Sequence, residues 1–212
     1  VLSLNTGKAC AYFEAKTWRR SRFGRRAFLA GAGCAALAGA GLLMLPIASR
    51  GEPAGFLDAL FTSTSATCVT GLVVRDTFTG WTVFGQLVIL ALIQLGGLGF
   101  MTFITLTSML LGKRLGLYDR KVLMQSAGNI TLDGTAALIR KIIPFTFVFE
   151  FAGAALLSIR FIPEFGVLRG IYAAVFHAIS AFCNAGFDLM GMRAPFSSLT
   201  AYVSAPLVSL TI

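Results

Sequence analysis

The amino-acid sequence predicts an all-α membrane protein that contains an internal repeat. Of its 212 residues, 56% are hydrophobic and only 13% are charged, which is more apolar than a soluble core requires. Several apolar runs are long enough to cross a bilayer, and a segment near residue 60 resembles one near residue 175. Helices are expected in such runs because a lipid-exposed backbone has to satisfy its own hydrogen bonds.

Four apolar runs are candidate spans, since a membrane-spanning helix needs about 20 mostly apolar residues. Residues 27–48 and 81–112 contain no charged side chain. Residues 142–159 are interrupted only by Glu150, and a fourth run covers residues 196–212. We expect these runs to open and close two successive units, 27–112 and 142–212, the second with a truncated closing helix.

The basic residues account for the net charge of +9 and predict the topology. They cluster before the first run and after the second, whereas the segments between carry few, so the positive-inside rule makes residues 1–26 and the loop 113–141 cytoplasmic. We therefore expect a multi-pass protein of the plasma (inner) membrane whose basic loop contacts anionic lipid. This placement does not resemble a nucleic-acid patch. The loop residues meant are Lys113, Arg114, Arg120, Lys121, Arg140 and Lys141.

Four cysteines and one histidine give no metal-site or disulfide spacing, and no cofactor is expected. An enzyme using Cys183 as nucleophile and His177 as base is the alternative from another class. The two residues are six positions apart, which places them on opposed faces of a helix. The sequence therefore argues against an enzyme.

Two segments, 59–74 and 174–189, align without a gap at an offset of 115 residues, and six positions are identical. In each copy a short amphipathic stretch lies between apolar runs and ends at a glycine. In the first copy that stretch, about residues 55–67, is too short to cross, and both its ends are expected on the outside. Such a re-entrant segment is tolerated where it lines a protein-enclosed path. The sequence therefore predicts repeated helix–pore helix–filter turn–helix units.

Two glycine-bearing turns follow the predicted pore helices. A cation that sheds water can be held by rings of backbone carbonyls. Glycine adopts the positive φ that such a turn needs, although an ordinary turn or a helix C-cap would use it too. The candidate ion-binding turns are Cys68, Val69, Thr70 and Gly71 in the first unit and Cys183, Asn184, Ala185 and Gly186 in the second.

Three stretches, S-A-T-C-V-T-G-L (65–72), Q-L-G-G-L-G-F (94–100) and S-A-F-C-N-A-G-F-D (180–188), resemble the Trk/Ktr/HKT superfamily of potassium uptake proteins. The resemblance implies a potassium-channel-like pore of four repeats, with Gly71 and Gly186 as filter glycines. It also implies that the chain is the N-terminal half, completed by two further repeats or a second copy. A cytosolic nucleotide-binding regulatory subunit is an implied partner.

Other functional readings stay open at this point. The chain could belong to a sodium-permeable or ion-coupled symporter of the same superfamily, or be a non-conducting truncated scaffold. For Glu150 we favour a structural role, either pairing near the cytoplasmic end or hydrogen bonding to another helix, over ion coordination, and for His177 a hydrogen-bonded packing role. Asp188 either attracts cations or is an ordinary loop acid. Close helix contact or local bending is expected at Gly96, Gly97 and Gly99.

Overall fold

A computed structural model describes residues 31–98, 132–194, 196–202 and 205–212. Within these residues the chain is helical, no β-strand occurs, and a single bridge joins Ser49 to Trp81. The all-α expectation is therefore met in the described part of the chain. Residues 1–26, most of the loop 113–141 and Gly99 lie outside it.

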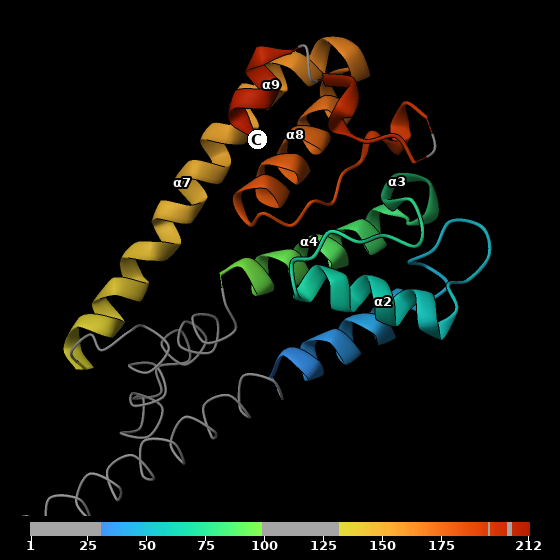
Figure 1. The fold of residues 1–212 in the computed structure, drawn as a ribbon, viewed down its shortest axis with the longest axis horizontal. Coiled ribbons are helices and arrows are strands. Elements are labelled where there is room, and N and C mark those ends of the chain that lie inside the picture. The colour runs from blue at the N-terminus through green and yellow to red at the C-terminus, as the bar shows by residue number, and fades with distance from the viewer. Residues whose placement is uncertain (1–30, 99–131, 195, 203–204) are drawn as a thin grey trace, which may run out of the picture.

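The first unit consists of a helix over Gly31–Leu43 followed by α2 (Phe56–Thr67), α3 (Thr77–Gly80) and α4 (Val83–Gly97). The first helix ends near Pro46, because the residue before a proline is disfavoured in the α conformation. The side chain of Ser63 on α2 donates to the Ala36 carbonyl at 2.6 Å, which joins α2 to the first helix. Figure 1 shows α2 beside that helix, and α2 also packs against α4.

The second unit consists of α7 (Leu132–Phe165), α8 (Val167–Phe182), η1 (Met190–Met192), η2 (Leu199–Tyr202) and α9 (Pro206–Thr211). Gly166 turns the chain with φ of 82°, so that α8 returns alongside α7 (Figure 1). Because α7 begins at Leu132, the last part of the segment expected as a cytoplasmic loop is helical.

The sequence led us to expect that the closing helix of the second unit begins near residue 196. In the structure it does not. Residues 199–202 form a 3-10 turn, and α9 starts only at Pro206 after the extended residue Ala205. Proline fits the first position of a helix and disfavours the α conformation in the residue before it. This local chemistry outweighs the continuous apolar composition of the run.

One helix in the described residues is long and apolar enough to cross a membrane, over Ile142–Phe165. Only 22% of its most apolar window is buried, which is unlike the core helix of a soluble protein. Phe145, Val148 and Phe151 are among its exposed side chains. Three shorter apolar helices cover Gly31–Leu43, Val83–Gly97 and Val167–Phe182.

The two units share a core. One buried cluster joins Ile89 and Ile93 of α4 to Phe176 of α8 and to Phe187 beyond it. A second cluster lies within the second unit and includes Phe161. The segments that follow α2 and α8 are therefore held by packing between the units.

Candidate functional site

The helices α2 and α8 end in the same backbone motif. Cys68 and Cys183 are their C-caps, with φ of −87° and −76°, and the next residues, Val69 and Asn184, have φ of 57° and 55°. The amide of Thr70 donates to the Ser65 carbonyl at 2.9 Å, and that of Ala185 to the Ser180 carbonyl at 2.7 Å. Both ends are Schellman motifs, and every matching pair is 115 positions apart.

The left-handed residue of the first motif is unfavourable for its type. Glycine usually occupies this position, and a side chain there costs roughly 1–2 kcal/mol. Asn184 tolerates the conformation better than most residues, but the β-branched Val69 does not. Val69 packs against the shared core cluster, so surrounding contacts maintain its conformation.

Gly71 and Gly186 lie two residues beyond the left-handed positions and have φ of 73° and 72°. The left-handed position that ends each helix is therefore occupied by Val69 and Asn184, directly after the caps Cys68 and Cys183, and not by the glycines. Each turn thus combines a Schellman motif with a second positive-φ residue, a path that few side chains can follow.

The two predicted turns lie against each other. A Cβ on Gly71 would lie 2.6 Å from the Ala185 carbonyl oxygen and 3.2 Å from Gly186 Cα. A Cβ on Gly186 would lie 3.4 Å from Gly71 Cα, an ordinary contact distance. All eight predicted site residues therefore belong to two turns that meet at their glycines.

Electrostatics at this junction favour a cation. The C-terminal end of a helix carries a partial negative charge, and both α2 and α8 end at these turns. Neither helix has a basic residue in its last turn. Among the described residues no group of three or more His, Cys, Asp or Glu side chains could hold a metal ion.

His177 is a packing residue with both ring nitrogens engaged. Nδ1 lies 2.7 Å from the Ala173 carbonyl, and Nε2 accepts from the Leu189 amide at 3.2 Å. Nδ1 faces a carbonyl and therefore carries a proton, whereas Nε2 accepts a hydrogen bond and therefore carries none. The ring is thus neutral. The Cys183 thiol donates instead to Gln94 at 3.7 Å. This arrangement supplies no nucleophile and base pair.

Glu150 makes one of the contacts that we favoured from the sequence. Its Oε1 accepts from Nε2 of Gln94 on α4 at 2.7 Å, and its side chain is buried. Asp188 accepts from the Met190 amide at 2.9 Å. Burial raises the pKa of Asp188 above its ordinary value, and the nearby Asp76 charge raises that pKa further. Gly96 and Gly97 make the close contacts expected of them, with Thr67 and Cys183 respectively.

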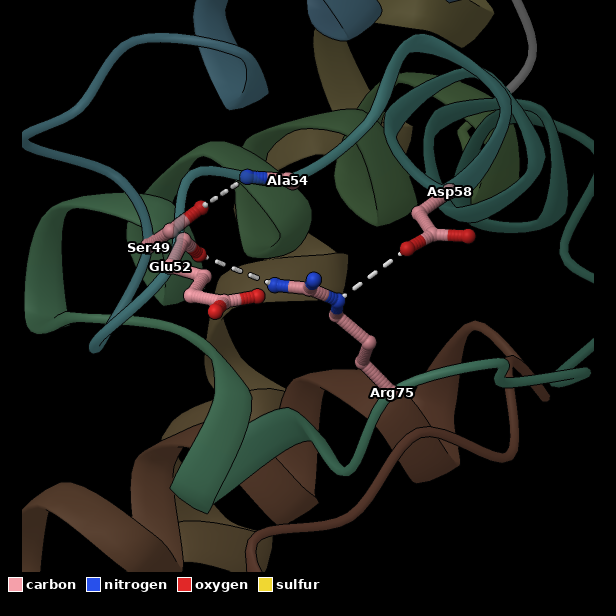
Figure 2. Close-up of polar contacts among 5 residues, drawn as sticks. All are labelled: Ser49, Glu52, Ala54, Asp58 and Arg75. Carbon is pink, nitrogen blue, oxygen red and sulfur yellow. Dashed lines mark hydrogen bonds and ion pairs between the residues drawn. The ribbon is translucent and has the colours of Figure 1, made fainter.

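The segment after the first turn is bound to the loop before α2 and to the first turn of α2. Figure 2 shows Arg75 between the two partners of its guanidinium group. Its Nε donates to Asp58 at 3.1 Å, and its terminal nitrogen donates to the Glu52 carbonyl at 3.2 Å. Ser49 closes the same loop by accepting from the Ala54 amide at 3.1 Å. Sequence reasoning assigned Arg75 no role beyond its charge.

Asp76 is a second residue that sequence reasoning missed. One carboxylate oxygen caps α3 by accepting from the amides of Phe78 and Thr79 at 2.9 and 2.8 Å. The other accepts from the Phe196 amide in the second unit at 2.8 Å. Asp before a short helix is a recognisable N-cap pattern. The bond to Phe196, 120 residues away, has no sequence signal.

The described residues form an all-α protein with one helix long and apolar enough to cross a membrane, and two turns of matching backbone path lie against each other in it. Residues 32–212 match the family described as TrkH, cation transport protein, and the chain belongs to that family. The family is one of cation transport proteins.

Individual relatives agree with this assignment. The chain is 48% identical over 174 residues to the Ktr system potassium uptake protein B of Bacillus subtilis, covering 82% of this chain and 38% of the relative. It is 46% identical over 156 residues to the potassium/sodium uptake protein NtpJ of Enterococcus hirae, covering 73% and 35%. It is 40% identical over 171 residues to a Ktr system potassium uptake protein B of Vibrio alginolyticus, covering 81% and 36%. The chain thus spans less than two fifths of the length of these relatives.

Proposed function

We propose that this chain forms part of the pore of a potassium uptake protein, and that residues 68–71 and 183–186 line its selectivity filter. The observation that carries the proposal is the contact between two turns of matching backbone path, each with a positive-φ glycine. In this proposal their backbone carbonyls replace the hydration shell of a passing potassium ion.

The neighbouring features support the same function. Two helix C-termini end at the turns, and neither brings a positive charge in its last turn. The relatives are named as potassium uptake proteins, and one as a potassium/sodium uptake protein. That second name favours sodium permeation or ion coupling as the alternative mechanism.

The rest of the assembly is part of the proposal. Two further repeats, or a second copy of this chain, would complete a four-fold pore, since the chain spans 38% of the length of one potassium uptake relative. The protein would lie in the plasma membrane with its N-terminus in the cytoplasm. The basic loop 113–141 would contact lipid and a cytosolic nucleotide-binding regulatory subunit.

Rubidium and sodium uptake by the full-length protein, in cells that lack potassium transport, tests this function. Gly71→Ser and Gly186→Ser should each lower the preference for potassium over sodium, because a side chain at these φ values distorts the turn. Gly41→Ser is the matched control, since nothing lies within 4 Å of a Cβ there. Unchanged selectivity in both filter variants would refute the assignment.

A further inference from the structure

Gln94 is a polar side chain on the apolar helix α4, and both ends of its amide are engaged. Its Nε2 donates to Oε1 of Glu150 on α7 at 2.7 Å. Its Oε1 accepts from the Cys183 thiol at 3.7 Å. Because only the amide nitrogen can donate to a carboxylate, these partners define the orientation of the amide. A side chain of the first unit thus connects a span of the second unit to the second turn.

Glu150 holds the Gln94 amide in place. The residue is 6% exposed and lies within the helix long enough to cross a membrane. An acidic side chain in such a position costs roughly 2.5–3.5 kcal/mol on insertion scales and needs a partner. The short bond from Gln94 supplies one, so the amide is held by a contact that is costly to break.

Gly97 shows how closely α4 approaches the second turn. It lies three residues after Gln94, and therefore on the same side of the helix. A Cβ on Gly97 would collide with the Cys183 thiol and would lie 2.6 Å from its Cβ. Cys183 thus rests against α4 at two points, one polar and one steric.

The first turn meets the same helix in another way. Gly96 approaches the Thr67 backbone, and a Cβ there would lie 2.9 Å from a methyl carbon of Val69. Cys68, the counterpart of Cys183, is exposed. The polar link through Gln94 is therefore a feature of the second turn, although the two turns share one backbone path.

We infer that Gln94 is a positioning residue for the second turn. Its side-chain amide holds Cys183 against α4, and Glu150 orients that amide. This inference rests on the proposed function, because the property that it controls is the spacing of the carbonyl oxygens of residues 183–186. Loss of the link frees the turn to relax and weakens the preference for the dehydrated potassium ion over sodium.

The test compares potassium-over-sodium preference among variants of the full-length protein. Cys183→Ala removes one hydrogen bond and should lower the preference roughly three- to tenfold. Gln94→Leu also removes the bond to Glu150 and should lower the preference at least as much. Cys183→Ser keeps a donor and should lose less than Cys183→Ala. The double variant should fall no further than the more severe single variant, because both changes remove the same bond.

Tyr172→Phe is the matched control. It removes a hydrogen bond of 2.8 Å from Tyr172 on α8 to Gln86 on α4, the two helices that Gln94 and Cys183 also bring together. That bond lies away from the turn, so selectivity should stay at the wild-type value. An equal loss in Tyr172→Phe would mean that any weakening between these helices suffices, and would overturn a specific role for Gln94.

The outcomes separate this inference from the proposed function. Wild-type protein without potassium uptake, or unchanged selectivity in both Gly71→Ser and Gly186→Ser, would refute the proposed function itself. If the wild type and the glycine variants behave as proposed, wild-type selectivity in Gln94→Leu, or additive losses in the double variant, would overturn the positioning role. If Gln94→Leu does not reach the membrane, the comparison of Cys183→Ala with Cys183→Ser decides in its place.

Discussion

Alanine at the two glycines should have unequal effects, and the inequality follows from the geometry of the junction. Gly71 and Gly186 have almost the same φ, 73° and 72°, so the conformational strain of a side chain is the same, about 1–2 kcal/mol. The space around them differs. A Cβ on Gly71 would lie 2.6 Å from the Ala185 carbonyl oxygen, whereas a Cβ on Gly186 would lie 3.4 Å from Gly71 Cα.

The difference sets the size of the expected effect. Gly71→Ala has to move the Ala185 oxygen by about 0.8 Å to reach the 3.4 Å of an ordinary contact. Distances between a bound metal ion and its ligands usually vary by only about 0.2 Å, so this displacement disturbs an ion site. Gly186→Ala strains its own turn but requires no movement of the other. Gly71→Ala should therefore reduce potassium preference more.

Parallel uptake of rubidium and sodium by the two variants, at matched amounts in the membrane, measures the inequality. Gly153→Ala is a control inside an apolar helix, since the nearest atom to a Cβ there is at 3.5 Å. Equal selectivity in the two filter variants, or a larger loss in Gly186→Ala, would show that the contact between the turns does not govern ion preference.

Three further predictions concern stability in detergent, measured by thermal unfolding. Asp76→Ala should destabilise the protein by about 1–3 kcal/mol, because it removes a helix cap and the hydrogen bond from the Phe196 amide. Asp58→Asn should cost about 1 kcal/mol or less, because its ion pair with Arg75 is partly exposed, and similar losses in the two variants would contradict this. Burial raises the pKa of Asp188 above its ordinary value of 3.8, so ionisation of this side chain destabilises the folded protein. The stability of the wild type should therefore fall relative to that of Asp188→Asn as the pH rises through the raised pKa. Parallel pH profiles of the two proteins would exclude the effect. Gly39→Ala should lower the melting temperature because its Cβ would lie 2.6 Å from Leu92, whereas Gly41→Ala has open space and should not.

The equivalence of the two turns and the positive φ of their glycines could be predicted from the internal repeat. Alignment at an offset of 115 matches Cys68 with Cys183 and Gly71 with Gly186, and the hydrogen bonds of the two Schellman motifs keep that offset. Local residue preference alone would have failed at Val69, which is a poor choice for a left-handed position. There, packing against the shared core outweighs the preference of the residue.

The start of α9 and the contacts between the units could not be read from the pattern. Hydrophobicity marks residues 196–212 as apolar, but Pro206 decides where the helix begins. Asp76 and Gln94 look like an ordinary loop acid and a lone polar residue in a helix. Their partners, Phe196 and Glu150, lie 120 and 56 residues further along the chain, and only the folded arrangement brings them together.

Three contacts join the first unit to the second turn or to the segment that follows it. The conformation of the second turn therefore depends on both units and not on its own unit alone. Gly71 lies against Ala185, and Gln94 accepts a hydrogen bond from Cys183. Asp76, which caps α3, also accepts a hydrogen bond from the Phe196 amide beyond η1. Each contact joins a residue of the first unit to the second turn or to the chain that follows it. A displacement of the second turn therefore has to break contacts with the first unit. For that reason, substitutions in the first repeat should change the ion preference contributed by the second.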